Sequence, residues 1–235
     1  YPLAQLRQQV AMVPQDPFLF GDALATNLTY DEPARSRDAI WAAAEAADLA
    51  RTARDFPDQL DTIVGERGVT LSGGQKQRAT LARGLIREAE VLVLDDCFSS
   101  VDTETEERIL TELKRMRQGR TTLLVSHRVS TARTSDRIVM LDAGRIVEVG
   151  SHTELMAANG AYAELARIQR EGGDAELERE RRGRDGQQLA LGAHAVLHVH
   201  VAHVREDTIE TGGQILAVDQ VAVQRVPVHE EIRMV

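Results

Sequence analysis

The sequence has few aromatic residues, 3% of its 235 positions, and a single cysteine, Cys97, which has no partner for an internal disulfide. One unpaired cysteine is typical of proteins from a reducing compartment. No stretch approaches the roughly 20 apolar residues of a membrane-spanning helix, and the first residues do not have the pattern of a signal peptide. The net charge of −9 argues against a broad nucleic-acid-binding face. Hydrophobic residues nevertheless make up 43% of the chain, enough for a core.

Short apolar runs alternate with helical patterns up to about residue 170. We expect strands at 9–13, 91–94 and 121–126, and a hairpin formed by 138–141 and 145–149. The run 91–94 is fully apolar, the mark of a strand buried on both faces. Helices are expected at 38–54, 73–89, 103–116, 153–158 and 161–170. This alternation predicts an α/β fold with a mainly parallel sheet.

The composition changes after residue 173. Residues 175–235 contain no Phe, Tyr, Trp, Cys, Lys, Asn or Ser, so this tail has no aromatic anchor for a core. We expect a domain boundary near residue 172. The tail beyond it is either disordered or a hairpin of the two Val-rich stretches 195–204 and 215–228. The missing residue types fit a divergent appendage or translation in a wrong reading frame, and both alternatives stay open.

A glycine-rich helix start is the strongest chemical signal. The segment Leu71-Ser72-Gly73-Gly74-Gln75 opens the helix at 73–89, with Ser72 as its N-cap. The free backbone N–H groups at such a start favour a phosphate, and the two glycines let an anion approach the backbone. The alternative interpretation is an ordinary capped helix, which Ser-Gly-Gly alone would favour.

Polar residues follow two of the apolar strands. Asp95 and Asp96 end the run Val91–Leu94, where open α/β sheets place their ligands. A carboxylate delivered in this way suits a Mg²⁺ ion that is bridged to nucleotide phosphates. His127 follows the next strand. A lone histidine in this position is more often structural than catalytic, but its place relative to the other two motifs favours function.

Together these residues resemble the nucleotide-binding domain of ABC transporters. Leu71–Gln75 is similar to the family signature, the run ending in Asp95-Asp96 to its Walker B strand, Ser99-Ser100-Val101-Asp102 to its D-loop, and His127 to its switch histidine. Gln15 matches the Q-loop, and Gly65-Glu66-Arg67-Gly68 resembles the X-loop of exporters. The resemblance covers residues 1 to about 171 and implies a partial P-loop NTPase-like domain over 1–172, with a helical subdomain at about 20–88.

The resemblance also implies a role for each matched residue. In one site, Asp95 would hold Mg²⁺ with Gln15, Asp96 would polarise the attacking water, and His127 would hold the γ-phosphate of ATP. In a second site, Leu71, Ser72, Gly73, Gly74 and Gln75 would close over ATP bound by another ABC ATPase domain in a head-to-tail dimer. Asp102 would link the two sites across the interface. Gln15 would also contact a transmembrane domain.

The first departure from the family is the missing phosphate cradle. A P-loop ends in Gly-Lys-Ser/Thr, but the two lysines, Lys76 and Lys114, follow Gln75 and Leu113. In the family this motif lies upstream of the position at which Tyr1 stands. We therefore expect an N-terminally truncated piece of a longer protein, whose membrane domain also lies upstream.

The second departure is Asp96, where competent sites of the family carry glutamate. Aspartate is one methylene shorter, and misplacement by about 1 Å can cost about a hundredfold in rate. The pattern resembles the degenerate half of heterodimeric exporters, although the retained His127 leaves a homodimer with a weakened base open.

We therefore predict the ATPase subunit of an ABC exporter at the cytoplasmic face of the cell membrane, with ATP and Mg²⁺ as cofactors and no nucleic acid as partner. The alternative for the isolated chain is a non-hydrolysing module that carries the signature to a partner. A soluble DNA-repair ATPase is a third interpretation. It is disfavoured because only 57 positions separate Gln15 from Ser72, which leaves no room for a long coiled coil.

Overall fold

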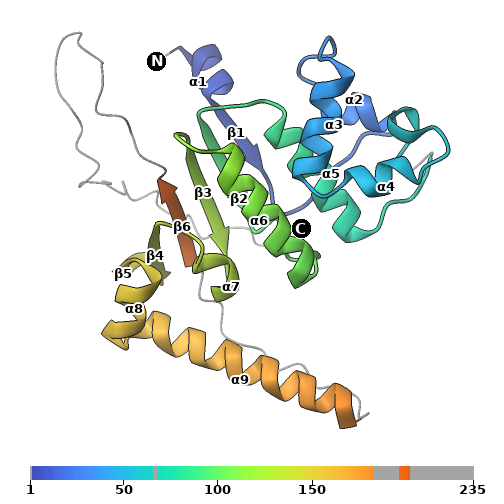
Figure 1. Cartoon of the computed structure of the whole chain (residues 1–235). Coiled ribbons are helices and arrows are strands. Elements are labelled where there is room, and N and C mark those ends of the chain that lie inside the picture. Colours follow the sequence, from blue (N-terminus) through green and yellow to red (C-terminus); the bar gives the residue numbers. More distant parts are fainter. Residues whose placement is uncertain (1, 66–67, 183–195, 202–235) are drawn as a thin grey trace, which may run out of the picture. The chain divides into compact units, whose positions relative to one another are not determined.

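The computed structural model describes residues 2–65, 68–182 and 196–201. A six-stranded sheet with the order β1-β2-β3-β6-β4-β5 forms its centre (Figure 1). Strands β1 (Val10–Val13), β2 (Val91–Asp95) and β3 (Thr121–Ser126) are parallel neighbours. β4 (Arg137–Asp142) and β5 (Arg145–Gly150) form the expected hairpin. The α/β prediction is confirmed.

Strands β2 and β3 are buried on one face and half-buried on the other, so the expectation of two fully buried faces is wrong for β2. Leu92 and Leu94 are fully buried, whereas Val91 and Val93 are half-buried. The buried side chains join a core shared with the helices of residues 24–113. Side chains of a strand alternate between two faces, and the described helices bury one face of β2 more completely than the other.

A group of helices lies between β1 and β2 in the sequence. It comprises α2 (Leu24–Leu28), α3 (Arg37–Ala46), α4 (Ala50–Arg54), the 3-10 turn η1 (Gln59–Asp61) and α5 (Gly73–Leu85). Both α2 and α3 pack against α5. A short helix, α1 (Leu3–Gln9), precedes β1. The sequence pattern did not indicate α1, none of whose residues is buried; its Leu3 and Leu6 are exposed.

The helix expected over 38–54 is broken into α3 and α4. Asp48 adopts a φ of 53°, and the N–H groups of Asp48 and Leu49 donate to the carbonyls of Glu45 and Ala44. This is a Schellman motif with aspartate in the left-handed position that glycine usually occupies. The alanine-rich periodicity continues through the break, which is why the pattern alone predicted one helix.

Helix α6 (Thr103–Met116) has the predicted bounds, and α5 ends four residues before the predicted 89. α5 stops at Leu85, and Glu88 then takes a φ of 50°, which ends the helical backbone. Gly84 lies against β1, where an added Cβ would stand 2.5 Å from Val13 Cγ2. The close approach of α5 to β1 therefore requires glycine at this position.

A second, smaller core forms around the hairpin. Helices α7 (Val129–Ala132), α8 (His152–Ala158) and α9 (Ala161–Arg182) contribute to it, and Tyr162 is fully buried among Ala132, Ile138, Met140 and Leu155. The Tyr162 hydroxyl lies 2.9 Å from His152 Nδ1. Burial raises the pKa of Tyr162 to about 12.

One strand of the tail belongs to the central sheet. α9 runs through residue 172 without a break, and β6 (Val196–Val201), within the first of the two Val-rich stretches, pairs antiparallel with β3 and β4. The second stretch, 215–228, lies outside the described residues. The domain boundary near residue 172 stays a prediction.

Candidate functional site

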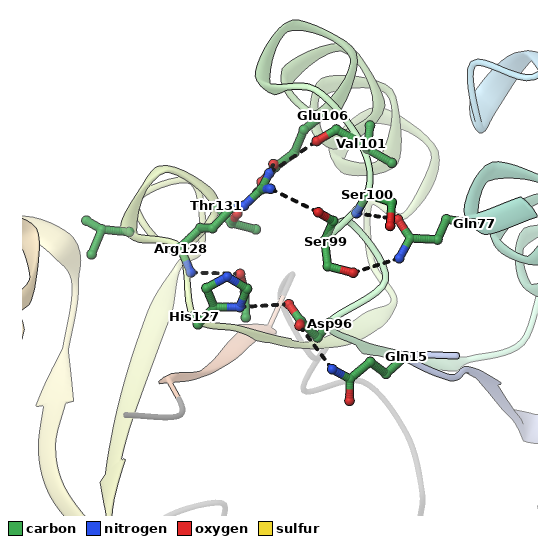
Figure 2. A network of polar contacts seen from close by, with 12 residues as sticks. Gln15, Gln77, Asp96, Ser99, Ser100, Val101, Glu106, His127, Arg128 and Thr131 are labelled. Carbon is green, nitrogen blue, oxygen red and sulfur yellow. Dashed lines mark hydrogen bonds and ion pairs between the residues drawn. The ribbon is translucent and has the colours of Figure 1, made fainter. Parts of the chain in front are cut away.

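Three predicted site residues meet at one edge of the sheet. Because β1, β2 and β3 are parallel and in register, their carboxyl ends lie side by side. Gln15 follows β1, Asp96 follows β2 and His127 follows β3. Gln15 Nε2 lies 3.4 Å from Asp96 Oδ2, and His127 Nδ1 lies 3.1 Å from Asp96 Oδ1 (Figure 2). The Asp96 carboxylate therefore lies between an amide and an imidazole.

Asp96 has an unusual backbone conformation. Its φ is 40°, in the left-handed region that aspartate tolerates better than most residues. Its N–H donates to the carbonyl of Val125 on the neighbouring strand at 2.9 Å. The left-handed turn directs the chain away from β2 while this bond keeps residue 96 against the sheet. The side chain is 18% exposed, against 57% for His127.

Asp95 is the last residue of β2 and is half-buried. Within the described ranges its carboxylate forms no side-chain hydrogen bond or ion pair. The Gln15 side-chain oxygen is also available, because only the Nε2 atom donates to Asp96. The same ranges contain no group of three His, Cys, Asp or Glu residues that could hold a metal by themselves. A Mg²⁺ site needs fewer, since one or two carboxylates with substrate phosphates suffice, so the donors fit Mg²⁺ bound together with a nucleotide.

Cys97 follows the two aspartates but is not part of this chemistry. The side chain is buried, and this burial raises the pKa of its thiol far above the usual range. The thiol therefore stays protonated at neutral pH and is not a nucleophile.

The start of α5 forms a second candidate surface. Ser72 is its N-cap, as predicted, and makes a capping box with Gln75: Ser72 Oγ accepts from Gln75 N–H at 3.3 Å, and Gln75 Oε1 accepts from Ser72 N–H at 2.9 Å. Ser72 and Gly73 are exposed, whereas Leu71 is buried and anchors the segment. The first helical residue, Gly73, therefore lies at the surface, at the positive end of the helix dipole, and Gly74 is half-buried.

Gly73 and Gly74 have a structural role at this surface. An added Cβ on Gly74 would lie 2.7 Å from the Ser100 carbonyl oxygen, and one on Gly73 would lie 3.4 Å from the Ser100 side chain. The helix start thus packs directly on the segment after β2. Across the described residues, no hydrogen bond joins Ser72–Gln75 to Asp96 or His127. We call the cluster around Asp96 and the start of α5 the two candidate half-sites.

Asp102 is the N-cap of α6. Its Oδ1 accepts from the Thr105 N–H at 2.9 Å, and this backbone hydrogen bond, with one from the Thr105 side chain, lowers the pKa of Asp102. The carboxylate is thereby oriented by its own helix.

Two connections were not predicted from the sequence. Gln77 is buried on α5, donates to Ser99 Oγ at 2.7 Å and accepts from Ser100 N–H at 2.9 Å (Figure 2). Arg128 binds the buried carboxylate of Glu106 and donates to the carbonyls of Ser99 and Val101 at 3.3 Å. Both side chains hold the segment 99–101 in place. A polar residue in a helical pattern usually indicates the solvent face, and this hid Gln77. Arg128 is the N-cap of α7, a helix that the sequence pattern did not indicate.

Comparisons with known proteins match these motifs. The family model described as "ABC transporter" matches residues 1–99, which include Gln15, the start of α5 and both aspartates. The sequence is 49% identical over 170 residues to an ATP-dependent lipid A-core flippase of Burkholderia orbicola strain AU 1054, and 47% identical over 170 residues to the flippase of Alkalilimnicola ehrlichii. The chain belongs to the ABC transporter family. These matches support a fragment of an exporter nucleotide-binding domain.

The fold of this ABC protein agrees with a solved relative. A bacterial Atm1-family ABC exporter, solved with ATP bound, superposes with a TM-score of 0.66 at 41% sequence identity. The match covers 71% of this chain and 29% of that exporter. The two flippase matches cover 72% of this chain and 28% and 29% of the relatives. The chain therefore spans less than a third of the length of each of these proteins.

No described helix is both long and apolar enough to cross a membrane.

Proposed function

We propose that this ABC domain hydrolyses ATP with Mg²⁺ in a dimer of nucleotide-binding domains and couples hydrolysis to export, at the cytoplasmic face of a membrane. The cluster of Gln15, Asp96 and His127 carries the proposal, together with Asp95, whose carboxylate forms no hydrogen bond or ion pair within the described residues. The relatives include two kinds of exporter, lipid A-core flippases and an Atm1-family protein. The proposal therefore stops at ATP-driven export and names no transported substrate.

In the first half-site, Asp95 and the Gln15 side-chain oxygen would hold Mg²⁺, which would supply charge neutralisation on the nucleotide phosphates. Asp96 accepts hydrogen bonds at both carboxylate oxygens, one from Gln15 and one shared with His127. This arrangement supports a role for the carboxylate in orienting a water and a role for the exposed imidazole in contacting a phosphate. Catalysis would rest on positioning and charge stabilisation, as in phosphoryl transfer generally.

In the second half-site, the exposed N–H groups at the start of α5 would bind the terminal phosphate of ATP seated on a partner domain. The capping box fixes Ser72 and Gln75, and Gly73 and Gly74 let the anion reach the backbone. Asp102, at the end of the same 99–102 segment on which α5 packs, would lie at the interface between the domains. Two half-sites with no hydrogen bond between them in the described part of the chain support a head-to-tail dimer.

We propose further that the partner domain is a different chain. Asp96 replaces glutamate, so the chain's own site would turn over slowly, whereas its signature is intact and would complete a faster site on the partner. A homodimer with a weakened base is the alternative. The subunit composition of the purified full-length exporter distinguishes these alternatives. A homodimer contains one kind of polypeptide, whereas a heterodimer contains two.

An exposed aromatic patch supports a membrane-domain partner. Phe18, Phe20 and Tyr30 are 62%, 46% and 50% exposed. The guanidinium carbon of Arg83 is 5.6 Å from the Phe20 ring and 5.4 Å from the Tyr30 ring, and the Phe18 ring lies 5.0 Å from that of Phe20. Arg83 also donates to the Phe18 and Asn27 carbonyls, at 2.8 and 2.7 Å. Exposed aromatic clusters of this kind mark interaction sites. The patch begins at Phe18, shortly after Gln15 in the sequence. A partner that binds there would therefore affect the position of Gln15 at the nucleotide site.

The experiment is ATPase activity of the full-length exporter that contains this domain. Ser72→Arg places a large cation at the start of α5 and is expected to block closure over the partner's ATP, abolishing most turnover. His127→Ala is expected to lower turnover at this chain's own site. Lys114→Ala, on the exposed side of α6, is the control. Undiminished ATPase in the Ser72→Arg exporter would contradict the proposal.

The alternative for the isolated chain is a signature-bearing module that does not hydrolyse ATP. The absence of a Gly-Lys-Ser/Thr cradle from the 235 residues favours it. Equilibrium ATP binding to the 235-residue chain decides this point. Micromolar affinity would overturn the alternative, and no measurable binding at millimolar ATP would support it.

A further inference from the structure

Helix α9 holds the chain on both sides of Arg128. Gln169 Nε2 donates to the His127 carbonyl at 2.6 Å, and Gln169 Oε1 accepts from the Val129 N–H at 2.8 Å. A carbonyl only accepts and an N–H only donates, so the orientation of the Gln169 amide is fixed. A two-point contact sets both the position and the angle of the backbone at residues 127–129.

The same three residues are held from the other side by the Arg128 side chain. Its guanidinium reaches the Glu106 carboxylate and the carbonyls of Ser99 and Val101 (Figure 2). Glu106 is 2% exposed, so this ion pair is shielded from solvent on the carboxylate side. Backbone contacts from α9 and side-chain contacts from the segment 99–106 thus meet at the residue that follows His127.

Helix α9 is itself anchored. Both carboxylate oxygens of Glu148, on β5, accept from the first turn of α9, from Ala161 N–H at 2.6 Å and Tyr162 N–H at 3.0 Å. Tyr162 is fully buried. Gln169 follows Tyr162 by seven positions, about two helical turns, so the two residues share a face of α9. The anchored tyrosine therefore determines where the Gln169 amide lies.

We propose that Gln169 is a positioning residue for His127. The imidazole is 57% exposed, and its one side-chain contact in the described structure is Asp96 at 3.1 Å, so the backbone determines where the ring lies. Gln169 fixes that backbone and keeps the ring directed toward Asp96. The catalytic consequence rests on the proposed ATPase function, but the contact itself does not.

Amide hydrogen exchange on the 235-residue chain tests the contact without nucleotide. Gln169→Leu removes both hydrogen bonds and is expected to speed exchange at Val129 about five- to tenfold. Gln169→Glu keeps an acceptor, so Val129 is expected to stay protected. Gln118→Leu, at an exposed glutamine after α6, is the matched control and should leave Val129 unchanged. Unchanged Val129 exchange in Gln169→Leu would overturn the proposal.

ATPase kinetics of the full-length exporter test the consequence. Gln169→Leu and Gln169→Glu both lose the donor to the His127 carbonyl, so kcat is expected to fall about tenfold or more with little change in KM for ATP. The melting temperature should match that of Gln118→Leu. A wild-type kcat in both variants, or a loss of kcat that follows a lower melting temperature, would overturn the positioning role. An exporter with no ATPase would instead refute the proposed function, and the exchange result would still judge the contact.

Discussion

Gly84→Ala should destabilise the wild-type chain but stabilise a variant in which the neighbouring Val13 side chain is shortened to alanine. Gly84 is buried where α5 crosses β1, and an alanine Cβ would lie 2.5 Å from Val13 Cγ2 and 3.7 Å from Leu92 Cδ1. Carbon atoms pack best at about 3.5–4.0 Å, so the new methyl group overlaps Val13 by about 1 Å and meets Leu92 without overlap. Val13 and Leu92 are each only 1% exposed, so neither has space to move into.

Two opposing terms set the magnitude. Overpacking of a filled core costs about 1–3 kcal/mol, while replacing glycine by alanine inside a helix returns about 1 kcal/mol. We expect Gly84→Ala to lower the free energy of unfolding by up to about 2 kcal/mol. In a Val13→Ala background the overlapping Cγ2 is gone, and the remaining Val13 Cβ is 3.9 Å away. There Gly84→Ala should raise the free energy of unfolding by about 1 kcal/mol.

Urea unfolding followed by circular dichroism measures all four chains of this double-mutant cycle. Gly21→Ala serves as a control, because an added Cβ there meets no atom within 4 Å. An effect of the same sign in both backgrounds would refute the packing of α5 on β1 described above.

Three further predictions concern single residues. Ala143 has a φ of 47° in the β4–β5 turn. Because glycine avoids the steric cost of that conformation, Ala143→Gly should raise the free energy of unfolding by about 0.5–1 kcal/mol. A lower urea midpoint for the variant would contradict this. Burial raises the pKa of Tyr162, so the folded state favours the neutral phenol. The resulting contribution to folding stability is complete below pH 10, the usual tyrosine pKa, and is lost as the pH rises toward about 12. Tyr162→Phe should therefore flatten the stability profile above pH 10 in thermal unfolding, and an equally steep fall in the variant would refute this cause. In the full-length exporter, Asp96→Glu should raise ATP turnover at this chain's own site by up to about a hundredfold, because the longer side chain reaches the water. Turnover at that site at or below the wild-type value would show that residue 96 does not limit its rate.

The features predicted from the sequence are those with a local cause. The run 91–94 is apolar because it is a central strand, and Asp95 and Asp96 lie at its carboxyl end as expected. Ser72 and Asp102 both cap helices, and α6 has the predicted bounds because it begins at its aspartate cap. The meeting of Gln15 with Asp96 and His127 follows from parallel pairing, which the alternation of strands and helices already indicated.

The features that the sequence did not reveal depend on contacts between distant positions. Arg128 and Glu106 are 22 positions apart, and Gln169 reaches His127 across 42. Helical periodicity places a polar residue on a face but does not say whether that face is buried against another polar group. The break between α3 and α4 was missed for a related reason, because aspartate at a left-handed position is rarer than glycine.

The central claim is that the start of α5 caps the terminal phosphate of ATP held by a second domain. Orthovanadate trapped with MgADP occupies the γ-phosphate position, and ultraviolet light then cleaves the backbone at a serine that contacts it. A tagged full-length copy of this chain with Asp95→Asn, which lacks the proposed Mg²⁺ ligand, is paired with an untagged partner subunit whose own Mg²⁺ site is intact. The account predicts cleavage of the tagged chain at Ser72, because the nucleotide that Ser72 contacts is held by the other subunit. A tagged chain that stays intact at Ser72 while vanadate is trapped in the untagged subunit would contradict the claim.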